Sequence, residues 1–132
     1  MSLGRGFCNT GENLTMADIT RLHSGKRISR VVVHNGIAYL AGIIALQKYG
    51  GSVAEQTRDI LGLIDRLLAE AGTDRTRLLT VTVWLADMRR AEEFNLVWDE
   101  WVPEGCAPAR STVEGRLTSP DHSVKIAVTA AL

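Results

Sequence analysis

The residue of this chain best suited to bind a small acid is Arg110. It stands in the segment Pro-Ala-Arg-Ser-Thr-Val-Glu, residues 108–114, after a loop that contains proline and at the beginning of an expected strand. A guanidinium remains charged at physiological pH and can bind a carboxylate through two parallel hydrogen bonds. The segment therefore indicates a site for a small carboxylic acid, and the alternative is an arginine held in a structural ion pair.

Three other side chains could carry acid–base chemistry near such a site. Glu114 lies on the same expected strand as Arg110, so the two side chains point to one face about 13 Å apart. This separation is too long for one small substrate and favours a structural salt bridge for Glu114. His34 precedes an expected hairpin turn and should be exposed, whereas His122 lies in a loop before the last strand and could line a cleft.

The sequence lacks the patterns of several other kinds of enzyme site. Its two cysteines, Cys8 and Cys106, are expected to be free thiols because no secretory leader is recognised. No histidine lies close in sequence to Cys106, so a nucleophilic cysteine is not expected. The chain also has no zinc-ligand spacing, no glycine-rich phosphate loop and no nucleophile elbow. We therefore expect no metal site and exclude the enzyme classes that depend on these motifs.

The composition predicts one domain without a signal for nucleic acid or membrane. Lys and Arg together number 15, as do Asp and Glu, so the net charge provides no attraction to phosphate backbones. No apolar run approaches the roughly 18 residues of a membrane-spanning helix, and no signal-peptide core is present, so a cytoplasmic location is expected. Residues 1–16, rich in Gly, Asn and Thr, should form a poorly ordered leader, and residues 17–132 a single domain.

The first half of that domain predicts strands followed by a helix. A short strand is expected at Ile19–His23. Two β-rich runs, Arg30–His34 and Ile37–Ala41, flank an Asn-Gly pair and predict a hairpin. Ser52 with Glu55 forms a capping box for a helix that ends at Gly72.

The second half predicts a strand, a helix and two strands. Leu78–Leu85 should be a strand with Leu79, Val81, Val83 and Leu85 on one face, and Asp87 should cap a helix that runs to about Trp101. The last strands are expected at Arg110–Leu117 and Ser123–Ala131. This order predicts an α+β fold with two helices packed on one face of a mixed, six-stranded sheet. The other face, with Thr80, Thr82 and Trp84, would then need a partner, which indicates an oligomer.

Seven motifs occur in the order that is typical of one protein family. They are Tyr39-Leu40-Ala41-Gly42; Glu55-Gln56-Thr57 with Asp59-Ile60-Leu61; Leu68-Ala69-Glu70-Ala71-Gly72; Val83-Trp84-Leu85-Ala86-Asp87-Met88; Phe94-Asn95; Pro108-Ala109-Arg110-Ser111; and Val124-Lys125-Ile126. With them the chain, from about Ile28 to Leu132, resembles the RidA/YjgF family of reactive-intermediate deaminases. Each motif alone is weak, but seven in register are specific.

The resemblance implies a chorismate-mutase-like α+β fold, assembled as a homotrimer with ligand pockets between subunits. It implies hydrolysis of 2-imino acids to 2-oxo acids and ammonia, without a metal or organic cofactor. Arg110 matches the arginine that binds the substrate carboxylate in this family. Thr112 stands where the family usually has a cysteine whose backbone helps to hold the ligand. Gly42 matches a glycine that lines the pocket, and Asn95 an asparagine near it.

Three departures from the family pattern concern the handling of water. By register from Val124-Lys125-Ile126, Ala127 stands where typical deaminases carry the glutamate that positions the attacking water. Alanine cannot orient water or relay a proton. The Gly-Pro-Tyr-Ser segment, whose tyrosine closes the pocket, is replaced by residues 24–29, and the arm at residues 43–47 is shorter.

Three functions are therefore compatible with the sequence. The first is a deaminase-like hydrolase of 2-imino or 2-enamino acids, with Arg110 as the anchor. The second is a module that binds a small carboxylic acid, such as a 2-oxo acid, without turnover, which Ala127 favours. The third is an RNA-directed endoribonuclease or translation inhibitor, because some family members carry these labels. Balanced charge and scattered basic residues count against the third.

Overall fold

Eight strands form a single mixed sheet in the computed structural model, which describes residues 6–7 and 18–132. Their order is β1-β2-β3-β4-β8-β6-β7, and β5 also pairs with β8. β6 and β7 are parallel, and all the other pairs are antiparallel. The strands are β1 (Gly6–Phe7), β2 (Thr20–Ser24), β3 (Ser29–His34), β4 (Ile37–Leu40), β5 (Ile43–Ile44), β6 (Leu78–Leu85), β7 (Ala109–Glu114) and β8 (Val124–Ala131).

The predicted α+β fold, a mixed sheet with two helices, is confirmed, with two strands more than the six expected. β5 follows Gly42 and pairs with β8. β1 lies within the expected leader and pairs with β2. The rest of that leader, and Cys8 with it, lies outside the described residues. The last strands are also shorter than expected, since β7 ends at Glu114.

The hairpin of β3 and β4 forms where the Asn-Gly pair predicts it. Asn35 has φ 50° and Gly36 has φ 78°, so both central residues adopt the left-handed region that a type I′ turn requires. His34 pairs with Ile37 directly across the turn. The turn thereby sets the register that places Val31 and Leu40 opposite each other in the core.

Helix α1 (Val53–Ala71) begins and ends at the predicted caps. Ser52 Oγ accepts from the Glu55 N–H, and Glu55 Oε1 accepts from the Ser52 N–H at 3.0 Å. This hydrogen bond from Ser52 holds the pKa of Glu55 below its ordinary value. Gly72 ends the helix with φ 93°, a left-handed conformation that suits glycine.

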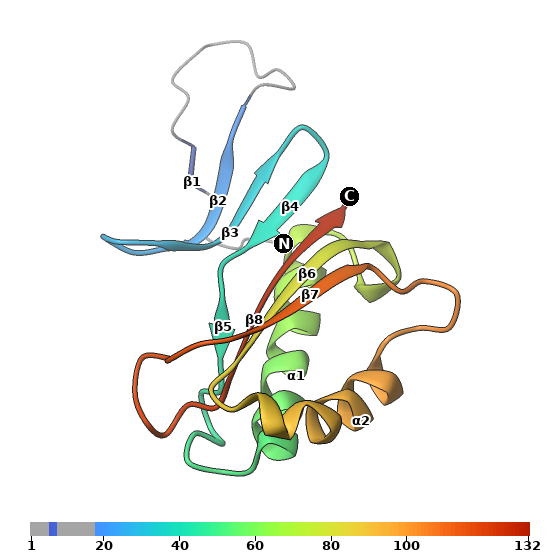
Figure 1. The fold of residues 1–132 in the computed structure, drawn as a ribbon. Coiled ribbons are helices and arrows are strands. Elements are labelled where there is room, and N and C mark those ends of the chain that lie inside the picture. Colours follow the sequence, from blue (N-terminus) through green and yellow to red (C-terminus); the bar gives the residue numbers. More distant parts are fainter. Residues whose placement is uncertain (1–5, 8–17) are drawn as a thin grey trace.

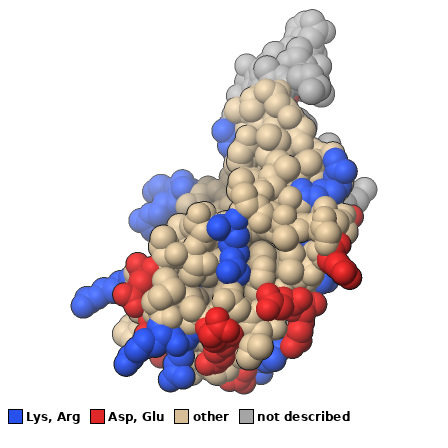
Figure 2. Space-filling model, turned by 45° about the vertical axis from the view of Figure 1, so that its right-hand side comes forward, with Lys and Arg blue, Asp and Glu red and all other residues tan. Residues whose placement is uncertain are grey.

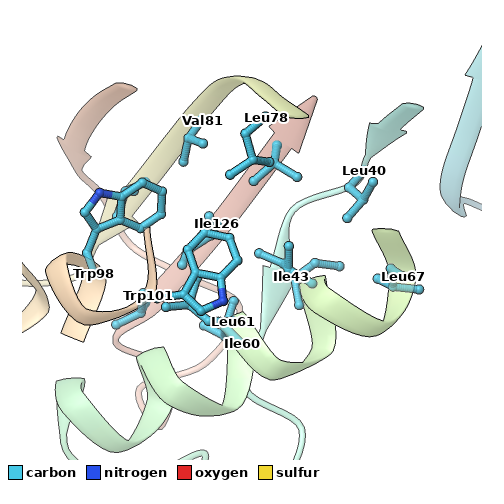
Figure 3. Close-up of a cluster of buried hydrophobic side chains, with 14 of the residues drawn as sticks. Leu40, Ile43, Ile60, Leu61, Leu67, Leu78, Val81, Trp98, Trp101 and Ile126 are labelled. Carbon is cyan, nitrogen blue, oxygen red and sulfur yellow. The ribbon is translucent and has the colours of Figure 1, made fainter. Parts of the chain in front are cut away.

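Helix α2 (Ala91–Trp101) continues from one 3₁₀ turn, η2 (Met88–Arg90), that Asp87 caps through the Arg89 N–H. A second 3₁₀ turn, η1 (Arg75–Arg77), precedes β6. Figure 1 shows α1 and α2 on the same side of β8, β6 and β7. The core lies between these layers, and Figure 3 shows Trp101 beside Ile126, Ile60 and Leu61 there, with Trp98 on the side of Val81. The helices therefore cover one face of the sheet. The opposite face, which neither helix covers, is called the open face below.

One predicted face of β6 needs correction. Val81, Val83 and Leu85 are buried as expected, but Leu79 is 42% exposed and Leu78 is buried instead. The pairing of β6 with β8 shifts between Leu78 and Thr80. Such an irregularity inserts a residue and reverses the alternation of side chains, so Leu79 moves to the open face. In the part of the chain that the structure describes, no helix is long and apolar enough to cross a membrane.

Candidate functional site

Arg110 lies on β7, at the edge of the sheet, and its side chain points to the helix side. Its backbone pairs with Val81, whose side chain is buried in the core. The guanidinium carbon lies 5.5 Å from the ring centre of Phe94 and 5.3 Å from that of Trp98. Both rings belong to α2 and are themselves buried. Two aromatic faces therefore hold the cation in place through electrostatic attraction.

A hydrogen bond completes the orientation of this guanidinium. Arg110 Nη2 donates to Asn95 Oδ1 at 3.0 Å. Among the described residues, Arg110 forms no ion pair with a carboxylate. The alternative of a structural ion pair therefore finds no partner in this part of the chain. An exposed cation with aromatic backing and unused N–H donors can accept a carboxylate from outside.

Thr112 lies on the same face of the strand as Arg110. It pairs with Val83, which is buried on the helix side, and its own side chain is half-buried. Two positions along a strand separate the two Cα atoms by about 7 Å. The structure thus brings together three of the four residues that the resemblance selects: Arg110, Asn95 and Thr112.

Gly42, the fourth, lies elsewhere. It connects β4 to β5, and the strands β8 and β6 stand between this connection and β7. A Cβ atom on Gly42 would stand 2.2 Å from Cε of Lys125. Lys125 alternates with the buried Val124 and Ile126, so its side chain lies on the open face of the sheet. Gly42 and Arg110 are therefore on opposite faces of one chain.

Ala127 belongs to the same open face as Gly42. It pairs with Thr82 on β6, and it alternates with the buried Ile126 and Val128. The residues selected by the resemblance thus form two groups. Arg110, Asn95 and Thr112 lie at the helix side of the β7 edge, and Gly42 and Ala127 lie on the open face.

The other candidate side chains have local partners. Glu114 Oε2 accepts from the Met88 N–H at 2.8 Å, so this carboxylate is structural, although its partner is a backbone N–H and not the expected salt bridge. His34 is half-buried, with Nδ1 3.3 Å from the Asp18 carbonyl oxygen, so the expectation of an exposed ring is wrong. Cys106 is a free, half-buried thiol in the loop after α2, as predicted.

His122 lines a hollow of about 350 Å³, but this hollow does not contain Arg110. Its walls come from the loop before β8 and include Arg116, Thr118 and Ser119. The His122 ring lies 6.1 Å from that of Tyr49, and its buried Nδ1 has no hydrogen-bond partner among the described residues. In a single chain His122 is therefore separate from the group formed by Arg110, Asn95 and Thr112. No cluster of metal-ligating side chains occurs among the described residues.

Sequence reasoning placed Trp84 on this open face but missed its neighbour Lys125. They pair with each other across β8 and β6, and Lys125 Nζ lies 5.2 Å from the Trp84 ring centre. The strict alternation of β8 already places Lys125 on the same face as Ala127. What the sequence does not show is that the lysine side chain reaches Gly42, because that contact joins residues far apart in the chain.

Comparisons with known proteins agree with these observations. The family model described as Endoribonuclease L-PSP matches residues 18–132. A RutC family protein of Haemophilus ducreyi is 42% identical over 114 residues, which is 86% of this chain and 97% of the relative. The RutC family protein YoaB of Escherichia coli is 35% identical over 114 residues, 86% of this chain and 98% of the relative.

Solved structures show the same fold. A YjgF family member from Neisseria meningitidis superimposes with a TM-score of 0.86 at 40% identity, over 89% of this chain and 97% of that one. A YjgF family member from Mycobacterium tuberculosis has a TM-score of 0.77 at 26% identity, over 86% of this chain and 99% of that one. The match covers the β7 edge, α2 and the open face alike, and the chain therefore belongs to the RidA/YjgF family, the Endoribonuclease L-PSP family of the sequence model.

Proposed function

We propose that this protein hydrolyses 2-imino or 2-enamino acids to 2-oxo acids and ammonia, with Arg110 binding the substrate carboxylate. The proposal rests on two observations about Arg110. Its guanidinium is oriented by Phe94, Trp98 and Asn95. It also forms no ion pair with an acidic residue among the described residues. Membership of the family supports an imine-deaminase-like role on small molecules at the family level.

Hydrolysis of an imine requires little from the protein beyond orientation of the substrate and of a water molecule. Water adds to the imine carbon, a proton moves to nitrogen, and the carbon–nitrogen bond breaks to release ammonia and leave the carbonyl group. An imine beside a carboxylate is intrinsically prone to this hydrolysis. A bidentate grip by Arg110 can hold the imine carbon near backbone N–H donors and an ordered water, which accelerates the addition without a dedicated base. Ala127 contributes no proton relay, so a modest acceleration is expected.

The complete pocket requires more than one copy of the chain. Because Arg110 and Gly42 lie on opposite faces, a second copy must supply one of them if both line the same pocket. The open face also carries exposed apolar side chains, Tyr39 at 43% and Val113 at 42%, together with Thr80, Thr82 and Thr129. We propose that this face is covered by neighbouring copies in a cytoplasmic homotrimer whose pockets lie between subunits.

A second candidate function is a carboxylate-binding module. The specific observation in its favour is Ala127, which keeps the Arg110 grip intact while removing the group that would position water. An RNA-directed activity has less support, because positive and negative side chains are interspersed on the face that Figure 2 draws and the net charge is zero.

The test is release of 2-oxo acid from imines that an amino-acid oxidase generates in the presence of competing semicarbazide. The native chain is compared with Arg110→Ala, with Arg110→Lys, and with Arg66→Ala as an exposed arginine on α1. We expect acceleration by the native chain and by Arg66→Ala, a loss of roughly 100-fold in Arg110→Ala, and partial retention in Arg110→Lys. No acceleration over buffer by the native chain, together with Arg110-dependent binding of a 2-oxo acid in calorimetry, would establish the binding module instead.

A further inference from the structure

On the part of the open face that β4, β5, β8, β6 and β7 form, Lys125 is surrounded by uncharged side chains. Two arginines, Arg21 on β2 and Arg30 on β3, lie on the same face further along the sheet. The register of β4, β8, β6 and β7 aligns the side chains of this face in rows. One row joins Ile44, Lys125, Trp84 and Val113; the next joins Ala127, Thr82 and Ser111; a third joins Tyr39, Thr129, Thr80 and Ala109. Lys125 is the one residue of acidic or basic type in these rows.

The side chain of Lys125 is held between the backbone of Gly42 and the ring of Trp84. Its methylene groups lie directly over Gly42, where an added Cβ would stand 2.2 Å from Cε and 3.3 Å from Cγ. Its ammonium lies 5.2 Å from the ring centre of Trp84. Because a side chain at position 42 would displace the lysine, the absence of one at Gly42 lets Lys125 lie against the backbone there. Whatever pocket Gly42 lines must therefore include Lys125 as well.

The ammonium of Lys125 has no carboxylate partner among the residues that the structure describes. It is half-buried in one chain, and a second copy on the open face would bury it further. A buried cation without a counter-charge is costly, and the Trp84 ring offsets only part of that cost, so an anion near Lys125 would stabilise the assembled pocket. Ala127 cannot supply one, although it lies on the same face about 7 Å away along β8.

We infer that Lys125 determines side-chain specificity in this site, and that it selects substrates with a second carboxylate, namely 2-iminodicarboxylic acids. The inference rests on the proposed function, in which Arg110 binds the carboxylate next to the imine. Lys125 of a neighbouring copy then binds the carboxylate at the other end of the substrate. An acidic residue at position 127 would repel that second carboxylate, whereas alanine leaves the attraction of Lys125 unopposed.

The experiment compares the imines of glutamate and norvaline, which differ in the terminal carboxylate. Hydrolysis is followed as 2-oxoglutarate or 2-oxopentanoate release, and kcat/KM is measured for each. The variants are Lys125→Met, which keeps the length of the side chain and removes the charge, and Ala127→Glu, which places a carboxylate beside Lys125. Lys26→Met, an exposed lysine in the turn after β2, is the matched control.

We expect the native chain and Lys26→Met to prefer the glutamate imine by roughly tenfold. Lys125→Met and Ala127→Glu should bring the ratio close to one. A native chain without this preference, or a Lys125→Met variant that loses activity on both imines equally, would overturn the inference and leave the Arg110-dependent activity standing.

Measurements of ligand binding test the role of Lys125 even if the protein does not hydrolyse imines. If the native chain accelerates neither imine, the proposed hydrolysis fails, and the dissociation constants of 2-oxoglutarate and 2-oxopentanoate decide the role of Lys125. Tighter binding of 2-oxoglutarate that disappears in Lys125→Met would support the inference for a binding module. Equal binding of the two acids, or a difference that persists in the variant, would overturn it.

Discussion

Arg110 on β7 and Asn95 on α2 are joined by a hydrogen bond of 3.0 Å from Nη2 to Oδ1. The bond ties the edge of the sheet to a helix that precedes it in the chain. The Asn95 side-chain amide accepts one N–H of Arg110, and the rings of Phe94 and Trp98 flank the guanidinium. The orientation of the guanidinium is therefore set before any ligand binds. Preorganisation of this kind lowers the entropy cost of binding an acid.

Substitutions of Asn95 should separate orientation from charge. Asn95→Ala removes the acceptor, and we expect the dissociation constant of a 2-oxo acid to rise about threefold to tenfold, the range of one hydrogen bond. Asn95→Asp should weaken binding further, because the new carboxylate pairs with Arg110 and competes with the ligand. Calorimetric titration of both variants measures this order. Weaker binding in Asn95→Ala than in Asn95→Asp would contradict the role of Arg110 as the anion site.

Gly42→Ala should be destabilising because of Lys125. The added methyl group meets the lysine side chain and displaces it, and because that side chain is flexible we expect a cost of at most about 1 kcal/mol of unfolding free energy. The double variant Gly42→Ala with Lys125→Ala should recover most of this loss. Urea denaturation of the native chain, the two single variants and the double variant measures the interaction free energy between positions 42 and 125. Strict additivity would show that the two residues do not compete for the same space.

The N-terminus of α1 should make stability depend on pH through Glu55. Its pKa is lowered in the folded state, so its contribution is present above the unfolded pKa and is lost as the pH falls through the lower, folded value. Glu55→Gln keeps a capping side chain without this titration. We expect the variant to lose less stability than the native chain between pH 6 and about pH 3. Thermal unfolding across this range provides the comparison, and parallel curves for both chains would refute the assignment.

A large charged side chain in the middle row of the open face should prevent assembly. Thr82 lies in the middle row of that face, between Ala127 and Ser111. Thr82→Arg is expected to yield monomers and to abolish imine hydrolysis, since the proposed pocket needs two copies. Leu96→Arg, at a 65% exposed position of α2, is the control. Light scattering after size-exclusion chromatography measures the mass, and a Thr82→Arg protein that remains oligomeric and active would locate the interface elsewhere.

Features that depend on neighbouring residues were predictable from the sequence. The capping box of Ser52 and Glu55, the Gly72 cap and the Asn35-Gly36 turn all form as expected, because their hydrogen bonds and backbone angles involve residues a few positions apart. Arg110 could likewise be selected by its type and its place at the start of a strand. The family and the α+β fold follow from the same local patterns.

Only the tertiary structure decided which residues meet. The shift between β6 and β8 moved Leu79 to the open face, and the strand order placed Gly42 and Arg110 on opposite sides of the sheet. The contact of Lys125 with Gly42 likewise depends on strand pairing between distant segments. A one-residue change in register reverses every side chain that follows, and nothing in the local sequence records it. The sequence alone therefore determined the helices, the turns and the choice of Arg110 as the candidate anion-binding residue, whereas strand pairing determined the composition of each face.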